Sequence, residues 1–85
     1  MNRETIENDT KIIVAEIVGV NVETIDNNAS FVGDLDFDSV RMLETIAVLE
    51  RKYRIRIPED DILTIRTINN AIDVVLSIIK ENNEE

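Results

Sequence analysis

One stretch, Asp34-Leu35-Asp36-Phe37-Asp38-Ser39-Val40, joins an acidic loop to the start of a helical hydrophobic pattern. The apolar residues that follow it recur at helical spacing, and they are Met42, Ile46, Leu49 and Tyr53, with Leu43 beside them. This periodicity predicts an amphipathic helix over residues 39–53. Ser39 then lies in the first turn, where its hydroxyl either caps backbone N–H groups or carries a phosphoryl group favoured by the helix dipole. Position alone leaves both alternatives open.

Two more apolar stripes predict long helices near the ends of the chain. The first helix should cover residues 5–18 and stop at Gly19, and its stripe is Ile6, Thr10, Ile13 and Ile17. The last helix should follow Thr67 as a candidate N-cap, and its stripe is Ile68, Ile72, Val75 and Ile79, widened by Ala71, Val74 and Ile78. Between the second and last helices, Pro58 and the acids after it predict a short helix over residues 59–63.

Residues 21–38 lack sustained periodicity and are rich in turn-forming residues, so we expect a long loop there. Four apolar side chains should anchor this loop on the core, and they are Ile25, Phe31, Val32 and Leu35. Residues 54–57 alternate like a strand but have no partner strand in the sequence, so we interpret them as a connector. The expected fold is all-α: a small four-helix bundle of three main helices and one short helix, forming a single domain over residues 1–85 with a frayed tail at 82–85.

Composition narrows the possible functions. The chain has 85 residues, no cysteine, no histidine and a net charge of -9. These absences exclude disulfides, thiolate metal sites and the usual general base, so we expect no enzyme. The acidity disfavours nucleic acid and anionic membranes and favours partners with basic patches. The sequence shows neither a secretory signal nor a long apolar run, so we expect a cytoplasmic protein that does not insert into membranes. We also expect a monomer.

Asp34, Asp36 and Asp38 have the spacing that opens a calcium-binding EF-hand loop. The rest of that loop does not match, because its sixth position needs glycine and is Ser39, and its twelfth needs glutamate and is Thr45. We therefore expect no dedicated metal site, with a weak surface site for divalent cations as the alternative.

Several segments around Ser39 resemble the acyl carrier protein family. Asp38-Ser39-Val40 follows the sequence Phe-Val-Gly-Asp-Leu at residues 31–35 and precedes a predicted helix that leads to Ile-Arg-Ile-Pro-Glu at residues 55–59. Residues 19–20 and 25–31 resemble the loop upstream of the family's attachment serine, and residues 65–72 resemble the start of its last helix. The similarity covers nearly the whole chain, with the segments in the same order and at the same spacings.

The resemblance implies that Ser39, in a motif with Asp38, carries 4′-phosphopantetheine through a phosphodiester. A separate phosphopantetheinyl transferase would attach this arm. Acyl-transfer and chain-elongation enzymes of fatty-acid or related biosynthesis would then act on acyl chains held on it as thioesters. The candidates for lining the acyl chain are Leu49, Ile57, Ile65, Ile72 and Val75.

Two residues depart from the family's pattern. Asp36 stands where the family usually has glycine, and Val40 where it usually has leucine. Glycine commonly marks a positive φ, and aspartate is among the few residues that tolerate the left-handed region, at a cost of roughly 1–2 kcal/mol. We therefore expect the left-handed backbone to persist at Asp36.

The resemblance also implies that the second helix presents acidic residues to partner enzymes. The candidate partner-binding residues are Val40, Arg41, Glu44, Ala47 and Glu50. Here, however, the charges over residues 38–53 sum to zero. Arg41 lies in the first turn, where the dipole disfavours a cation, and its helical compensation is a pairing with Glu44. Arg41 either offsets the neighbouring aspartates or selects enzymes with a less basic docking surface.

Two alternative functions share the predicted fold. One is a specialised carrier for a secondary pathway, such as polyketide or surface-lipid assembly. The other is a helical adaptor without an arm, in which Ser39 is only an N-cap. A hydrolase with Ser39 as nucleophile is disfavoured, because the chain has no histidine and no G-x-S-x-G context.

Overall fold

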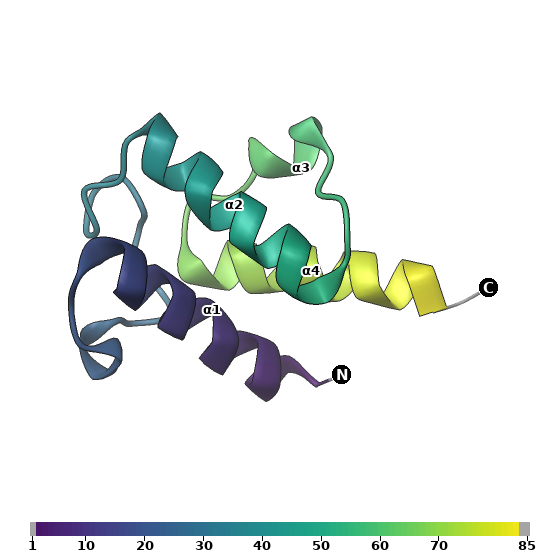
Figure 1. Ribbon diagram of the computed structural model, residues 1–85, viewed down its shortest axis with the longest axis horizontal. Helices are drawn as coiled ribbons and strands as arrows, with labels where there is room; N and C mark the ends of the chain where they lie inside the picture. The colour runs from purple at the N-terminus through teal and green to yellow at the C-terminus, as the bar shows by residue number, and fades with distance from the viewer. Residues whose placement is uncertain (1, 84–85) are drawn as a thin grey trace.

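The computed structural model describes residues 2–83, and over that range the chain is a small helical bundle without β-strands. Its elements are α1 (Arg3–Val18), the 3-10 turn η1 (Val22–Thr24), α2 (Ser39–Tyr53), α3 (Glu59–Ile62) and α4 (Ile68–Asn83) (Figure 1). The predicted fold class is therefore confirmed. Within the described residues, none of the helices combines the length and the apolar character needed to span a bilayer.

Both ends of α1 are set by local capping. The side chain of Asn2 accepts a hydrogen bond from the Thr5 backbone N–H at 2.9 Å, so the helix begins at Arg3, two residues before the predicted start. At the other end Gly19 adopts φ 84° and its N–H donates to the Ala15 carbonyl at 2.8 Å. Glycine takes this left-handed conformation without steric cost, which explains why the helix stops there as predicted.

The bounds predicted for α2 are confirmed at both ends. The helix ends because Arg54 turns to φ 54°. Arg51 and Lys52 occupy its last turn, where the helix dipole favours cations. The connector that follows contains no strand, and its Ile57 N–H donates to the Glu50 carboxylate at 2.9 Å, which ties the connector back to α2.

The short helix α3 ends one residue earlier than predicted, and Leu63 after it is 73% exposed. The predicted cap of α4 is confirmed, because the Thr67 hydroxyl accepts from the Asn70 N–H at 3.2 Å. The side-chain oxygen of Asn70 in turn accepts hydrogen bonds from the backbone N–H groups of Arg66 and Thr67, at 3.0 Å each. Residues 82 and 83 continue α4, whereas residues 84–85 lie outside the described range, so the frayed tail at 82–85 stays a prediction.

The long helices enclose one core, with α1 packed against both α2 and α4. Side chains from all three long helices are fully buried in it, and they include Ile6, Val14, Leu49, Ile68, Ile72 and Val75. Leu43 was predicted to lie beside the core stripe of α2, and this prediction is wrong, because its side chain is 60% exposed. The apolar face of α2 is thus narrower than its sequence pattern indicates.

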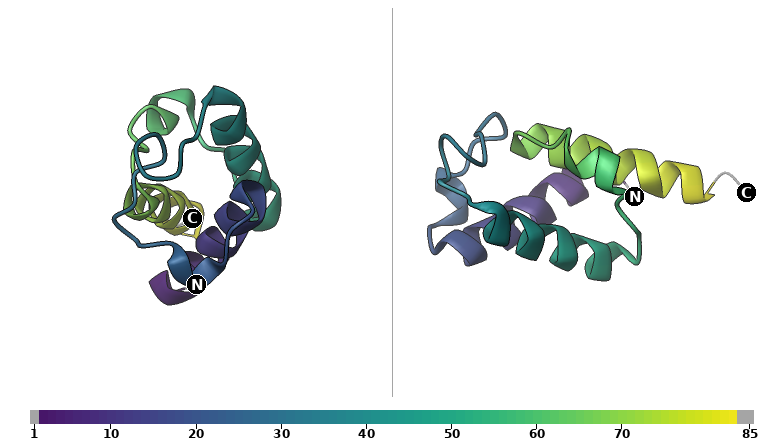
Figure 2. Two further views of the ribbon diagram at one scale, coloured as in Figure 1. Left: turned by 90° about the vertical axis from the view of Figure 1, so that its left-hand side faces the viewer. Right: turned by 90° about the horizontal axis from the view of Figure 1, so that it is seen from above.

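The loop between α1 and α2 gathers at one end of the bundle, beside the C-terminus of α1 and the N-termini of α2 and α4 (Figure 2). Ile25 and Phe31 anchor it as predicted, and Phe37 is buried with them, its ring 5.2 Å from that of Phe31. Leu35 is half-buried, whereas Val32 is 75% exposed, so its predicted anchoring role is wrong. The Phe31 N–H also donates to the Arg66 carbonyl at 2.9 Å, which fixes the loop to the start of α4.

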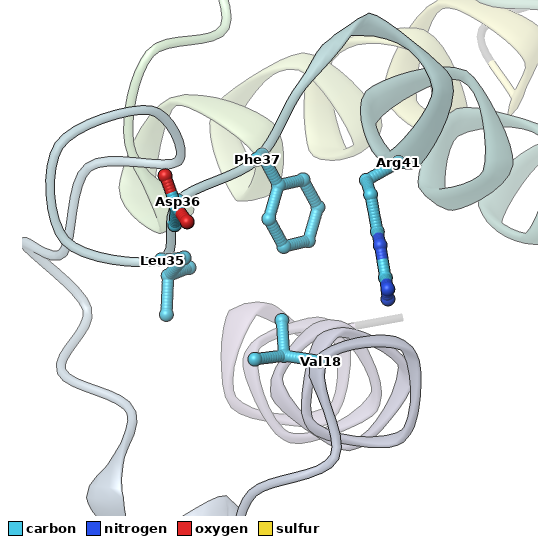
Figure 3. A pocket seen from close by; sticks show the side chains of 5 residues that line it. All are labelled: Val18, Leu35, Asp36, Phe37 and Arg41. Carbon is cyan, nitrogen blue, oxygen red and sulfur yellow. The ribbon is translucent and has the colours of Figure 1, made fainter.

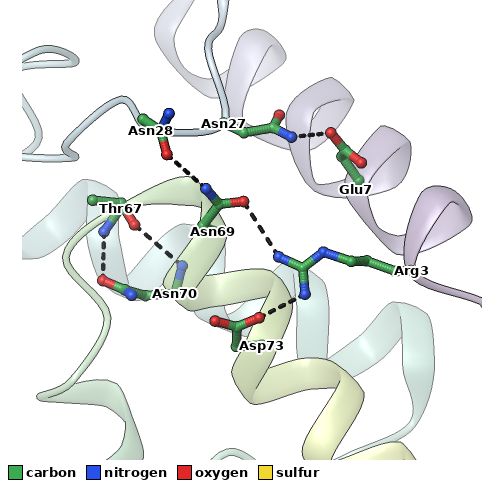
Figure 4. Close-up of polar contacts among 8 residues, drawn as sticks. All are labelled: Arg3, Glu7, Asn27, Asn28, Thr67, Asn69, Asn70 and Asp73. Carbon is green, nitrogen blue, oxygen red and sulfur yellow. Dashed lines mark hydrogen bonds and ion pairs between the residues drawn. The ribbon is translucent and has the colours of Figure 1, made fainter.

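A polar network strengthens this attachment on the outer side (Figure 4). Arg3 donates to the Asp73 carboxylate at 2.6 Å and thereby joins α1 to α4. The Asn69 amide donates to Asn28 in the loop at 2.8 Å, and the Asn27 amide donates to Glu7 on α1. The hydrogen bond from Asn27 lowers the pKa of the Glu7 carboxyl. The loop that leads to Ser39 is thus held by two helices.

Candidate functional site

Ser39 is the first residue of α2 and its side chain is exposed. The residue that caps the helix is Asp38, whose carboxylate accepts a hydrogen bond from the Arg41 N–H at 2.9 Å. The interpretation of Ser39 as the N-cap is therefore wrong. With the cap supplied by its neighbour, the Ser39 hydroxyl faces solvent at the positive end of the helix dipole.

The backbone before Ser39 makes a sharp turn at Asp36, which adopts φ 55°. The sequence predicted a left-handed backbone at Asp36, because the family usually has glycine at this position, and that prediction is confirmed. The turn is held on both sides: the Leu35 N–H donates to the Ser30 carbonyl at 3.0 Å, and the Phe37 N–H to the Phe31 carbonyl at 2.8 Å. Asp36 thus keeps the geometry of the turn despite its Cβ.

The three aspartates of the loop do not converge. The Asp34 carboxylate accepts from the Ser30 N–H at 2.8 Å, whereas the Asp38 carboxylate is occupied in the cap of α2. Among the described residues, no group of three or more potential ligands is placed to hold a metal ion. The alternative of a weak divalent site at Asp34, Asp36 and Asp38 is therefore not supported by the geometry.

Arg41 has a partner that the sequence did not indicate. Its guanidinium donates to the backbone carbonyl of Ile17 near the end of α1, and Figure 3 shows the side chain reaching from α2 toward that helix. The predicted pairing with Glu44 is wrong, because the ion pairs within residues 2–83 are Arg3–Asp73 and Lys11–Glu7. A cation at the C-terminal end of a helix is favoured by the dipole and by the unpaired carbonyls there. Arg41 therefore links the first turn of α2 to the last turn of α1.

Beside Arg41 lies an open pocket of about 230 Å³ (Figure 3). Its lining combines one cation, one carboxylate and an apolar floor, contributed by Val18, Leu35, Asp36, Phe37 and Arg41. The pocket is the space left between the end of α1 and the turn that leads to Ser39.

The predicted partner-binding residues of α2 divide into two groups. Val40, Arg41 and Glu44 are exposed near Ser39, and Val40 is 63% exposed. Ala47 is half-buried, and so is Glu50, whose carboxylate is occupied by the Ile57 N–H. Leu43 joins the exposed group and was missed, although its place one turn after Ser39 was a usable signal.

The five candidate acyl-lining residues all lie in the core, with exposures of 7% or less, and they are Leu49, Ile57, Ile65, Ile72 and Val75. A mostly apolar cavity of about 360 Å³ opens near the first turns of α2, lined by Ser30, Phe31, Val32, Met42, Ile65 and Arg66. Ile65 is the residue common to both sets. Met42 was assigned to the core stripe without a role at the site, yet it lies one turn after Ser39 on the inward side of α2.

Comparison with known proteins gives one consistent result. A family model described as "Phosphopantetheine attachment site" matches residues 10–75. An acyl carrier protein of Acidothermus cellulolyticus is 31% identical over 75 residues, which cover 88% of this chain and 89% of that protein. The crystal structure of an acyl carrier protein from Thermotoga maritima superposes with a TM-score of 0.82 at 28% identity, covering 98% of this chain and 96% of that one.

A further structural relative is the apo doublet acyl carrier protein from prodigiosin biosynthesis, with a TM-score of 0.75 at 28% identity. The match covers 87% of this chain and 36% of that chain. The bundle and the matched family model define a phosphopantetheine-binding carrier domain. The chain belongs to the acyl carrier protein family.

The cofactor of this family is 4′-phosphopantetheine. The geometry around Ser39 fits such a group, because an attachment residue needs an exposed hydroxyl that is not committed to helix capping, and Asp38 provides the cap. The chain has no cysteine, so any thiol that it presents must belong to the attached arm.

Proposed function

We propose that Ser39 carries the 4′-phosphopantetheine arm as a phosphodiester, and that the protein presents acyl intermediates on it as thioesters to biosynthetic enzymes. The observation that carries this proposal is the division of roles at the start of α2. Asp38 caps the helix, which leaves an exposed hydroxyl one residue later. A phosphodiester on that hydroxyl would lie at a helix N-terminus, where an anion is favoured.

The chain supplies the hydroxyl and the shelter, and its partners supply the catalysis. It has no histidine, so a phosphopantetheinyl transferase must provide the base that activates Ser39. Acyl-transfer and chain-elongation enzymes must likewise provide the chemistry at the thioester. The protein is accordingly proposed to be a carrier without catalytic activity of its own. A cytoplasmic location and a monomeric state stay predictions.

The apolar core is the proposed shelter for the acyl chain. The cavity beside Met42 and Ile65 opens near the turn that bears Ser39, so a chain attached there can enter the bundle between α2 and the segment before α4. Deeper side chains would then contact it, and we assign this role to Leu49, Ile57, Ile72 and Val75. Burial of each methylene of the guest stabilises the sheltered state by about 0.8 kcal/mol.

The exposed side of α2 is the proposed docking surface for partner enzymes. Val40 and Leu43 form an apolar pair beside Ser39, and Glu44 adds a carboxylate. A second candidate function, a carrier dedicated to a secondary pathway, is favoured by the zero net charge over residues 38–53. Such a surface would be read by enzymes with a less basic docking patch. One structurally similar protein, the apo doublet acyl carrier protein, comes from prodigiosin biosynthesis.

The attachment proposal is tested by incubating the apo protein with coenzyme A and a promiscuous phosphopantetheinyl transferase. We expect the intact mass to rise by one arm in the wild type and in the control Ser77→Ala, which removes an exposed serine of α4. Ser39→Ala should gain nothing. Absence of any addition, under conditions that modify an established carrier, would support the adaptor without an arm and sink the proposal.

A further inference from the structure

The apolar cavity near the first turns of α2 has one charged side chain in its lining, that of Arg66. Arg66 belongs to the segment before α4 and is exposed, so its side chain lies where the cavity meets solvent. It forms no ion pair within residues 2–83, where the ion pairs are Arg3–Asp73 and Lys11–Glu7. A guanidinium donates hydrogen bonds and accepts none. This side of the cavity therefore offers a strong donor without a carboxylate to occupy it.

Ser30 adds a second donor to the same cavity. Its hydroxyl oxygen accepts hydrogen bonds from the backbone N–H groups of Gly33 at 2.7 Å and Asp34 at 3.1 Å. A hydroxyl has two acceptor lone pairs and one proton, so these two bonds leave the proton as the part that Ser30 can still offer. We call the Arg66 guanidinium and the Ser30 hydroxyl the donor pair, and together they suit a ligand that brings an acceptor oxygen.

The backbone beneath the donor pair is held by hydrogen bonds. The Phe31 N–H donates to the Arg66 carbonyl at 2.9 Å, and the Arg66 N–H donates to the Asn70 side chain at 3.0 Å. Ser30 and Thr67 also face each other as an isolated antiparallel bridge. A site whose backbone is already ordered loses less conformational freedom when a ligand binds.

The place of the cavity indicates a ligand tethered to Ser39. Met42 lines the cavity and lies three residues after Ser39, and side chains at that spacing are neighbours on a helix, about 5–6 Å apart at Cβ. The Ser39 side chain is exposed, so a phosphodiester on it stays at the surface. The part of the arm beyond the phosphate is the part that can enter the cavity. That part contains amide carbonyls and, once loaded, a thioester carbonyl, all of which accept hydrogen bonds.

We propose that the donor pair, Arg66 and Ser30, binds a carbonyl oxygen of the arm where the arm enters the cavity, and so holds the attached chain in its sheltered position. The inference rests on the proposed attachment at Ser39. A carbonyl that leaves water for an apolar cavity loses its hydration, and hydrogen bonds from the donor pair offset that loss. Arg66 is thus a positioning residue for the loaded carrier.

The first test follows the Arg66 side chain itself by nuclear magnetic resonance. The Nε–H signal of Arg66 is assigned through bonds from its own backbone amide, in the apo, holo and octanoyl forms of the wild type. We expect this signal to shift on loading, whereas that of the exposed Arg56 in the connector should stay unchanged. A shift already present in the holo form identifies an amide carbonyl, and one that appears only in the octanoyl form identifies the thioester carbonyl. An Arg66 signal that is the same in all three forms would overturn the proposal.

The second test measures how well the thioester is sheltered. Wild type, Arg66→Met, Arg66→Lys and the control Arg56→Met are loaded with octanoyl arms and treated with hydroxylamine, and cleavage is followed by intact mass. Arg66→Met keeps the hydrocarbon stem and loses the donors, so we expect cleavage about two- to tenfold faster than in wild type, the effect of one hydrogen bond that is partly open to solvent. Arg66→Lys should lie between the two, and Arg56→Met should match wild type.

Equal or slower cleavage of Arg66→Met would contradict the role of Arg66. The apo melting temperatures of the variants should stay near that of wild type, because the substituted side chains are exposed, and this checks that the fold is kept. The loading step separates this failure from failure of the proposed function. Proteins that never gain an arm at Ser39 refute the attachment proposal, whereas loaded proteins with equal cleavage rates refute the donor pair alone.

Discussion

Replacement of Asp38 by alanine should destabilise the protein, because this side chain caps α2. Its carboxylate accepts from the Arg41 N–H at 2.9 Å, and losing such a cap costs about 1 kcal/mol, within a range of roughly 0.5–2 kcal/mol. The negative charge near the helix N-terminus adds about 0.3–1 kcal/mol. Each 1 kcal/mol lowers the melting temperature of a domain of this size by about 4–8 °C.

Matched variants separate the cap from its neighbour. Asp38→Asn keeps the accepting oxygen and should lose only the charge contribution, about 0.3–1 kcal/mol. Ser39→Ala should stay within about 0.5 kcal/mol of wild type, because the residue is exposed and alanine is a good helix former. Urea unfolding of the apo proteins, followed by far-ultraviolet circular dichroism, measures all three. If Ser39→Ala loses as much stability as Asp38→Ala, the serine is the cap and the assignment of roles is wrong.

Three further predictions concern Asp36, Tyr53 and Arg41. Asp36→Gly should stabilise the apo protein by about 1 kcal/mol in urea unfolding, because Asp36 holds φ 55°, and a less stable variant would contradict the strain at this turn. Burial, followed by the hydrogen bond from the Tyr53 hydroxyl to Asp9 at 2.7 Å, raises the pKa of Tyr53. The contribution of the Tyr53 hydroxyl to the free energy of unfolding is therefore complete below the ordinary pKa of about 10, and it is lost as the pH rises above that value. The stability advantage of wild type over Tyr53→Phe should accordingly shrink from about pH 9 to 11. An advantage that is constant over that range would refute the coupling. Arg41→Asp should be loaded faster than wild type by a standard fatty-acid-pathway acyltransferase. If the two proteins are loaded at equal rates at both low and high salt, Arg41 does not select partners and acts only through its contact with Ile17.

The helices could be predicted because their signals are local. The apolar stripe of α2, which ends at Tyr53, was enough to predict both bounds of that helix. The start of α1 was missed because Asn2 caps the helix ahead of the first apolar residue of the stripe. The difference between Asp38 and Ser39 as cap is a shift of one residue, which hydrophobic periodicity does not resolve.

The contacts that were missed are those between segments distant in the sequence. Arg41 bonds to Ile17 across 24 positions, and no helical spacing indicates such a pair. Leu43 and Val32 are apolar, yet they are exposed because neighbouring elements do not cover them. Thr10 was placed on the buried stripe of α1 from sequence, but only the packed structure reveals that its hydroxyl has no partner in the described part of the chain.

The central claim is that the arm is attached at Ser39, and fragment-ion mapping of the holo protein tests it most directly. The holo protein is made with coenzyme A and a transferase, digested, and fragmented by tandem mass spectrometry. The account predicts that the mass of the arm lies on Ser39, in the peptide that also contains Asp38. An arm found on Ser30 or Ser77, the other serines of the chain, would contradict it.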